Sequence, residues 1–236
     1  MKFIKQAMTL VAVALLAGLF AVPAVAQKKK SRTQDAARHA GEAAEAFTQI
    51  MNVRDKAIPK ELLDKAEGIA VFPGVVKAAF IVGGRGGQGV ISRRVKGGWT
   101  APAFFNLSGG SFGAQVGAQK TDYVLLIMNE EGMKGLLRDK FELGGEVSVA
   151  AGPIGREAAA STNPRLDAGI LSYSRNKGLF IGAALKGAVI SPDNDLNQAI
   201  YQLKASELLS FSFSGRGKLP AEVRILPETL RRYTRR

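Results

Sequence analysis

The spacing of apolar positions predicts helices near both ends of the chain and strands between them. In residues 35–53 apolar side chains recur every three or four positions, which is typical of an amphipathic helix. Residues 59–65 predict a second, short helix, because Pro59 suits the first position of a helix. Two more helices are expected at 129–140 and at about 197–209.

Short apolar or alternating runs separated by glycine fill the middle of the chain and predict β-strands. The glycine-rich stretch 83–89 is expected to be the turn of a hairpin. The fold class that follows is α+β: a single Gly-rich antiparallel sheet of about eight strands, barrel- or sandwich-like, with N-terminal and C-terminal helices packed on it. The expected strands are 69–72, 77–82, 89–93, 99–107, 112–119, 123–128, 146–151, 168–175 and 179–186.

The N-terminus has the pattern of a secretory signal peptide. Two lysines precede an uncharged apolar run at 7–22, and the Ala-Val-Ala triplet at 24–26 suits cleavage before Gln27. An uncleaved membrane anchor is the alternative, because about 16 apolar residues could hold in a bilayer. The expected domains are a signal peptide at 1–26, a basic linker at 27–34, the main domain at 35–215 and a basic C-terminal tail without regular structure at 216–236.

Composition limits the chemistry that the chain can support. Its 236 residues include 33 Lys+Arg and 20 Asp+Glu, a net charge of +13, with no cysteine and one histidine. The lack of cysteine excludes disulfides, Cys-ligated zinc, iron–sulfur clusters and a thiol nucleophile. A signal peptide without disulfides favours export to a bacterial periplasm. The positive charge selects anionic partners such as phospholipid headgroups, nucleic acid or anionic glycans.

Three motifs resemble ligand sites but fit structural roles better. Residues 84–89 match G-x-G-x-x-G, yet a strand pattern follows where a nucleotide loop needs a helix. Residues 177–182 lack the stacking aromatics of an RNA-binding box, and 193–195 lack the later glycine and glutamate of a calcium loop. With His39 alone, no hydrolase triad is supported. We therefore expect no catalytic residue, metal, cofactor or nucleic-acid partner.

Several independent motifs, in order along the chain, resemble the SYLF domain family. The resemblance covers roughly residues 35–215. It implies a non-enzymatic lipid-binding protein, since animal members bind phosphoinositides through an amphipathic helix and basic residues. Fungal members bind and bundle actin. The motifs lie at 65–72, 77–82 with the glycines that follow, 99–102, 109–113, 122–129, 151–156, 173–174, 177–180 and 201.

The predicted function is association with anionic phospholipid as an exported, periplasmic protein, peripheral on the membrane. Phosphatidylglycerol and cardiolipin are the bacterial ligands expected. The alternative is a scaffold that binds an anionic polymer or an unknown protein partner, as the eukaryotic relatives bind actin. For Arg93 and Arg94 a solvated strand edge, and for the apolar face of the helix plain core packing, are open alternatives to lipid contact. The candidate lipid contacts are Lys28, Lys29, Lys30, Arg32, Lys77, Arg85, Arg93 and Arg94, with Phe47 and Met51 as inserted apolar groups.

Overall fold

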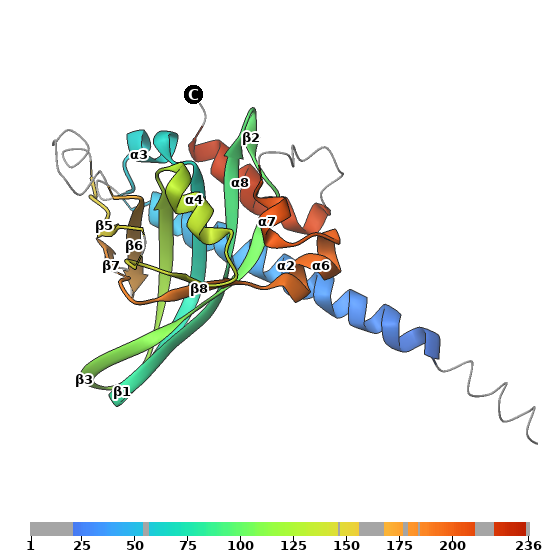
Figure 1. The fold of residues 1–236 in the computed structure, drawn as a ribbon, viewed down its shortest axis with the longest axis horizontal. Helices are drawn as coiled ribbons and strands as arrows, with labels where there is room; N and C mark the ends of the chain where they lie inside the picture. Colours follow the sequence, from blue (N-terminus) through green and yellow to red (C-terminus); the bar gives the residue numbers. More distant parts are fainter. Residues whose placement is uncertain are drawn as a thin grey trace, which may run out of the picture.

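A single curled sheet with helices packed on both of its faces forms the body of the protein (Figure 1). The computed structural model describes residues 21–53, 57–145, 147–155, 168–176, 179–183, 185–210 and 220–234, without the side chains of 21–30, 79–82 and 111–118. The helices are α2 (Ala21–Met51), α3 (Lys60–Lys65), α4 (Glu130–Leu136), α6 (Asn194–Tyr201), α7 (Ala205–Leu208), η2 (Ala221–Val223) and α8 (Ile225–Tyr233). The strands are β1 (Gly68–Val95), β2 (Gly98–Trp99), β3 (Ala103–Ile127), β4 (Phe141–Glu142), β5 (Val149–Ala151), β6 (Ile170–Asn176), β7 (Leu179–Gly182) and β8 (Val189–Pro192).

Two long strands, β1 and β3, form the centre of the sheet. They pair antiparallel from Gly68–Ile127 to Ile91–Ala103. The predicted hairpin turn at 83–89 is therefore wrong, because these glycines lie inside β1. Two of them, Gly87 and Gly89, are needed there for packing: β1 bends back on itself, and a Cβ on Gly89 would lie 2.4 Å from the Val71 carbonyl oxygen.

The remaining strands extend the sheet on both sides of this pair. One half of β3 pairs with β6, and the other half pairs with β8, which also pairs with β4. The described sheet has eight strands, as the sequence predicted, with helices from both ends of the chain packed on it. One ladder differs from the prediction: β5 runs parallel to β6, so the sheet is mixed.

Two apolar clusters stabilise the curl from its two faces. The outer cluster packs α2, α6 and α8 on the sheet, with Phe47 fully buried as the central aromatic of α2. The inner cluster fills the curl itself and is closed by α4 and α7. The apolar face predicted for 35–53 is thus confirmed as a core face, and its buried members are Ala36, Ala40, Ala43, Phe47 and Ile50.

Both ends of the described chain are more helical than predicted. Helix α2 begins at Ala21, so the expected linker at 27–34 is helical, because lysine, arginine and glutamine are good helix formers and no glycine or proline interrupts them. The expected tail forms η2 and α8, since buried Leu226 and Leu230 anchor it on the body. Trp99 donates its indole N–H to Thr234 at 3.1 Å. None of the described helices is both long and apolar enough to cross a membrane.

Two predicted helices show how local signals succeeded or failed. Asn129 caps α4 as expected, with its Oδ1 accepting the Gly132 N–H at 2.9 Å. The helix expected at about 197–209 is instead split into α6 and α7. Gln202 takes a left-handed conformation with φ 60°, which ends α6.

Candidate functional site

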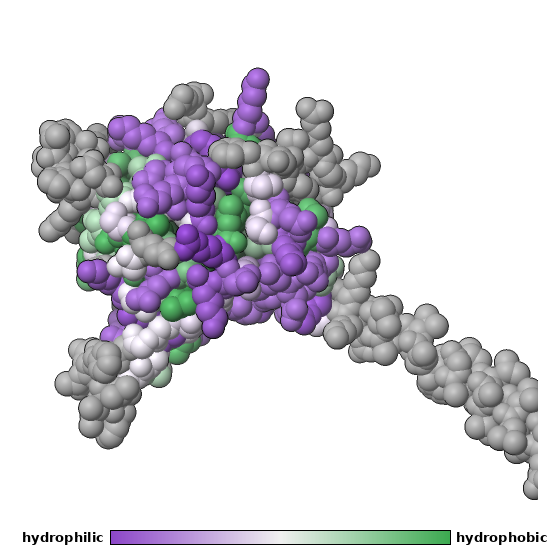
Figure 2. Space-filling model, viewed as in Figure 1, coloured by the Kyte–Doolittle hydropathy of each residue, from purple (hydrophilic) through white to green (hydrophobic). Residues whose placement is uncertain are grey.

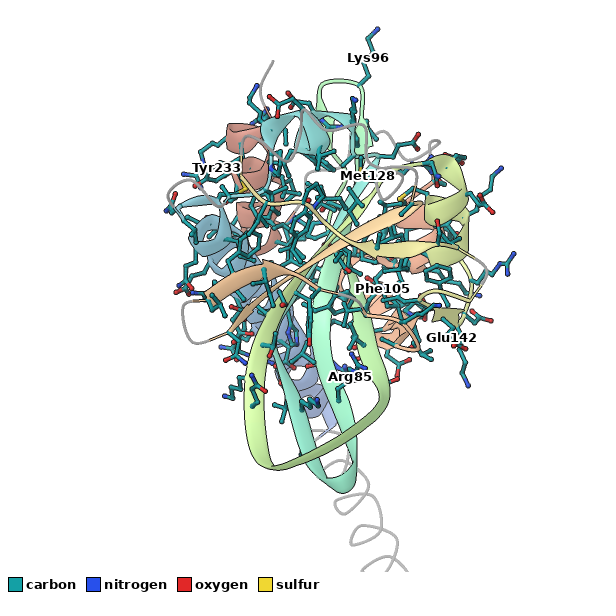
Figure 3. All side chains as sticks on the ribbon, turned by 90° about the vertical axis from the view of Figure 1, so that its left-hand side faces the viewer. Arg85, Lys96, Phe105, Met128, Glu142 and Tyr233 are labelled. Atoms are coloured by element: carbon teal, nitrogen blue, oxygen red, sulfur yellow. The ribbon has the colours of Figure 1, made fainter. Side chains whose placement is uncertain are left out.

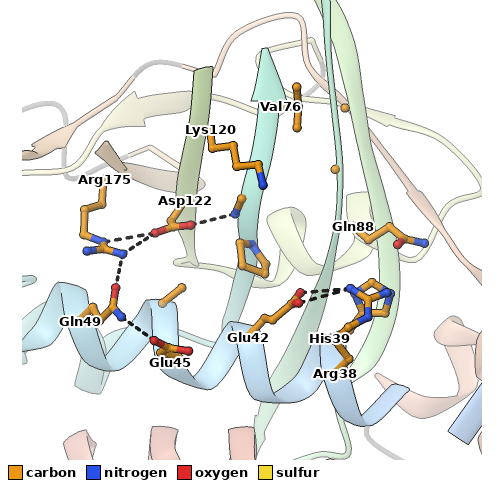
Figure 4. A pocket seen from close by; sticks show the side chains of 15 residues that line it. Arg38, His39, Glu42, Glu45, Gln49, Val76, Gln88, Lys120, Asp122 and Arg175 are labelled. Carbon is orange, nitrogen blue, oxygen red and sulfur yellow. Dashed lines mark hydrogen bonds and ion pairs between the residues drawn. The ribbon is translucent and has the colours of Figure 1, made fainter. Parts of the chain in front are cut away.

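A polar pocket of about 580 Å³ lies between α2 and the sheet (Figure 4). Helix α2 supplies one wall, and β1, β3 and β6 supply the other. Its lining residues are Arg38, His39, Glu42, Glu45, Ala46 and Gln49 from α2, Pro73, Gly74, Val76, Gly86, Gly87 and Gln88 from β1, Lys120 and Asp122 from β3, and Arg175 from β6.

One end of the pocket is a closed network of hydrogen bonds. The Asp122 carboxylate accepts the Gly74 N–H through Oδ1 and Arg175 Nη2 through Oδ2, both at 2.8 Å. Arg175 Nη2 also donates to the side-chain oxygen of Gln49 on α2. This network links three strands to the helix, so Asp122 and Arg175 already satisfy each other and fix the pocket wall.

The other cations of the pocket differ in what they already contact. Arg38 lies 3.4 Å from Glu42 and 3.8 Å from Asp35 on the same exposed helix face, a pairing that stabilises by only a few tenths of a kcal/mol. Lys120 is exposed, and within the described residues it has no hydrogen-bond or ion-pair partner. Figure 4 shows its ammonium over the pocket. Lys120 is therefore the pocket cation that an anionic ligand would meet first.

The carboxylates of the pocket are already paired with neighbouring side chains. The pocket carboxylates are engaged by Arg38, Arg175 and Gln49, and no nucleophile stands beside a base among its described residues. The described part of the chain also holds no group of three or more histidine, aspartate or glutamate residues placed to bind a metal ion.

His39 is buried beside the pocket, with 4% of its surface exposed. Burial lowers its pKa first and the charge of Arg38 lowers it further, while Glu42, Asp35 and Asp193 act in the opposite direction. Arg38 donates to His39 Nε2 at 3.2 Å. Burial and Arg38 therefore favour the neutral imidazole, although carboxylates on α2 and at the start of α6 oppose this effect.

We expect the free energy of unfolding to fall as the pH falls below about 7. Unfolded His39 takes up a proton near its ordinary pKa of 6.5, whereas the folded protein binds that proton only at a lower pH. The unfolded state thus holds more protons in this window, which favours unfolding. Urea unfolding between about pH 8 and pH 5.5 checks this slope. In His39→Gln the slope should flatten, and an unchanged slope would contradict the assignment.

The predicted contacts on α2 and β1 have different environments. Lys28, Lys29 and Lys30 lie in the first part of α2, outside the described side chains, and Arg32 follows them half-buried. Lys77 and Arg85 are half-buried on β1, and Arg85 Nη2 donates to the Gly110 carbonyl at 3.3 Å. The residues of this set whose side chains are described, Arg32, Lys77 and Arg85, keep part of their surface in solvent.

Three of the candidate contacts are occupied inside the protein, so their assignment to lipid is corrected. Arg93 is buried against Glu130, with Nη2 to Oε2 at 2.5 Å, rather than on a solvated strand edge. Arg94 donates to backbone carbonyls of α3 and its C-terminal end and covers the Trp99 ring, 4.4 Å from its centroid. Phe47 is fully buried, so it cannot insert into lipid, and Met51 packs half-buried on the same cluster.

The pocket itself was missed at the sequence level. Asp122 and Arg175 pair directly across β3 and β6, so the known preference for opposite charges at facing positions would have found them once the register was known. A second basic surface was missed on α8, where exposed Ile225 lies among Arg224, Arg231 and Arg232. The sequence signal that could have revealed this surface is the helical spacing of the buried residues in Ile225–Tyr233, which lies within the predicted C-terminal tail.

Comparison with known proteins gives consistent matches. A family model named Ysc84 and described as "Las17-binding protein actin regulator" matches residues 108–233. The chain is 36% identical over 189 residues to Protein YSC84 of Saccharomyces cerevisiae, covering 77% of this chain and 40% of that protein. It is 38% identical over 151 residues to LAS seventeen-binding protein 3 of the same yeast, covering 62% and 33%. It is 32% identical over 211 residues to SH3 domain-containing YSC84-like protein 1 of Xenopus laevis, covering 86% and 62%. The chain thus spans less than two thirds of each of these relatives.

Proposed function

Since the chain belongs to the Ysc84 family of SYLF domains, whose family model and one yeast relative are named for binding a protein, we propose that it is a non-enzymatic protein that binds anionic phospholipid at a membrane surface. The family resemblance inferred from the sequence is confirmed. The lipid ligand, the bacterial envelope as its setting and the contact residues are the proposal.

The observation that carries this proposal is a pair of basic segments that both project from the lower end of the molecule as drawn in Figure 1. The first part of α2, with its basic stretch at 28–32, extends from the body (Figure 1). The bent ends of β1 and β3 project at the lower left of Figure 1 and the first part of α2 at the lower right, so the two are separate and share only the lower side of the molecule. Lys77 and Lys120 lie where these bent ends begin, and the pocket lies between them and α2.

The energetics fit a reversible, salt-sensitive association. Each lysine or arginine near an anionic surface contributes about 1 kcal/mol, so the basic stretch with Lys77 and Lys120 would contribute about 6 kcal/mol. That is a dissociation constant of tens of micromolar, at low salt. Screening at high salt removes most of this term, so any binding that survives requires an apolar contact.

Vesicle co-sedimentation of the protein purified after export tests the proposal. We expect binding to phosphatidylglycerol or cardiolipin vesicles at low salt and little binding to phosphatidylcholine. The variant Lys77→Glu/Lys120→Glu should bind at least about 30-fold more weakly, because two contacts of about 1 kcal/mol each are lost and repulsion is added. The matched control Lys65→Glu/Lys96→Glu makes the same change in net charge at the opposite end, where α3 and the β1–β2 turn lie (Figures 1 and 3).

Two results would overturn the proposal. Absence of any preference for anionic vesicles at low salt would exclude lipid as the ligand. An equal loss in both double variants would show that net charge, and not this end of the molecule, determines binding.

A protein partner is the second candidate function, and the family description favours it. The matched model is described as a Las17-binding actin regulator, and the yeast relative is named for binding LAS seventeen. Under this candidate the same basic surfaces would contact an acidic protein. Vesicle binding would then be weak and fully released by salt, while a soluble partner would bind without lipid.

We also propose that the protein is exported and cleaved before Gln27, which leaves the basic stretch near the new N-terminus. N-terminal sequencing of the protein from a periplasmic extract tests this directly. An N-terminus at Met1 in a membrane fraction would support the uncleaved anchor instead.

A further inference from the structure

The bent ends of β1 and β3 form a projecting two-stranded ribbon, here called the finger (residues 77–85 and 109–120). On one side β8 ends its pairing with β3 at Ser108, and on the other β6 ends its pairing at Asp122. Between these points β3 pairs with β1 alone among the described strands. Figure 1 shows the finger standing away from the helices and the other strands.

The finger has charged residues only at its base. In the finger, β1 carries no charged residue between Lys77 and Arg85, and β3 carries none from Gly109 until Lys120. In Figure 2 pale and green residues gather along its described part, beside a largely hydrophilic body. The apolar residues along the backbone of its outer part are Phe80, Ile81, Val82, Phe112 and Val116.

The cations at the base lie at one level of the ribbon. Where β1 folds back, a Cβ on Gly87 would lie 2.8 Å from Val75 Cγ2, so these two residues face each other across the bend. Two residues closer to the tip come Lys77, on the half of β1 that runs outward, and Arg85, on the half that returns. Lys120 is next to Lys77, because it pairs with Val76 in the β1–β3 ladder. Figure 3 shows Arg85 between the body and the bent end of the ribbon.

An uncharged apolar tip beyond a ring of cations is the arrangement expected of a group that enters the boundary of an anionic bilayer. We propose that the finger inserts its tip there, while Lys77, Arg85 and Lys120 contact lipid phosphates. This inference rests on the proposed lipid function and identifies the element that gives salt-resistant binding. Charge complementarity selects the anionic bilayer over a neutral apolar surface.

Strand geometry limits the depth of insertion. The four residue steps from Lys77 to Ile81 span about 13 Å at about 3.3 Å per residue. That length reaches through the boundary, which an inserted apolar face enters by about 5–10 Å. The ribbon has unpaired backbone groups along its edges, and the hydrocarbon core offers them no partner. The tip therefore stops at the boundary between headgroups and acyl chains.

A single fluorescent label provides the test, because the chain has no cysteine. The variant Phe80→Cys, labelled with an environment-sensitive fluorophore, should show a blue shift and increased intensity on phosphatidylglycerol vesicles. Control labels at Lys134→Cys on α4 and Ile225→Cys on α8 should not change. Co-sedimentation of the same samples measures binding independently of the signal.

The outcomes separate the insertion from the proposed function. Binding with an unchanged Phe80→Cys signal would overturn the insertion and leave lipid binding intact. A shift at Ile225→Cys alone would assign the contact to α8. If neither the labelled variants nor the unlabelled protein co-sedimented with the vesicles, both the insertion and the lipid-binding function would be overturned.

A charge at the tip gives a second readout. Ile81→Glu should abolish the part of vesicle binding that survives high salt while keeping much of the binding at low salt. The matched control Leu179→Glu places the same charge on an exposed aliphatic position of β7, outside the finger, and should leave both parts unchanged. Equal behaviour of the two variants, with thermal unfolding unchanged, would contradict insertion of the finger.

Discussion

Gly89→Ala is expected to lower the free energy of unfolding by about 3 kcal/mol, at the upper end of the usual cost of overpacking. The added methyl group would lie 2.4 Å from the Val71 carbonyl oxygen and 2.4 Å from Phe72 Cδ1. Val71 and Phe72 are buried on the half of β1 that precedes the bend, whereas Gly89 lies on the half that follows it. The Val71 carbonyl belongs to the backbone, so it cannot rotate away as a side chain could. The two limbs of β1 would have to separate, which opens the inner cluster. Urea unfolding followed by circular dichroism measures the loss.

Gly84→Ala and Gly86→Ala are matched controls on the same strand. The atoms nearest to the methyl groups that these substitutions add are the backbone oxygens of Gly109 and Leu107, at 3.9 and 4.0 Å, which is ordinary contact. Alanine also restricts the unfolded chain, so these variants should be unchanged or slightly more stable. Similar losses in all three variants would show that the limbs of β1 do not meet at Gly89.

The glycines of β1 explain why the class of fold could be predicted but not the lengths of its strands. Local rules treat a run such as 83–89 as a turn, since glycine usually interrupts a strand. Here the same residues stay in the ladder, and Gly87 and Gly89 are small because another part of β1 packs against them. That contact joins positions distant in sequence, and no local pattern reveals it.

The candidate site was predictable in its chemistry more than in its geometry. The basic character of the chain could be read from its composition, but neither Lys77 nor Arg85, which the strand pattern offered as contacts, lines the pocket, and their contact with lipid is a proposal. Arg93 and Arg94 could not be distinguished from them, because their partners come from α3, α4 and the segment after α7. The pocket depended on the register that sets Asp122 opposite Arg175.

Glu130→Ala is expected to destabilise the protein by about 3 kcal/mol, because it leaves the buried guanidinium of Arg93 without its carboxylate. The Arg93 side chain is 2% exposed, and its Nη1 donates to the Leu209 carbonyl at 3.1 Å, so it cannot turn toward solvent without breaking the anchor of that segment. Glu67 stays close: burial raises its pKa and the charge of Glu130 raises it further, so removing Glu130 should ease its ionisation. The nearby Glu67 carboxylate and the 41% exposure of the Glu130 side chain both keep the loss at the lower end of the range for broken buried pairs.

The double variant Arg93→Met/Glu130→Ala separates charge burial from packing. It removes both charges and keeps an apolar chain in the buried position, so it should be more stable than Glu130→Ala by about 1–2 kcal/mol. Glu131→Ala is the control for the helix end: it removes a carboxylate from the same first turn of α4, is exposed, and should cost at most about 0.5–1 kcal/mol. If Glu130→Ala matched Glu131→Ala, or if the double variant were the least stable of the three, the buried pair would not be what holds β1 to α4. The expected order of the free energies of unfolding would instead show that the Arg93–Glu130 ion pair is among the main contacts that close the inner face of the curl. Arg93 would then have a structural role in place of the lipid contact that the sequence predicted.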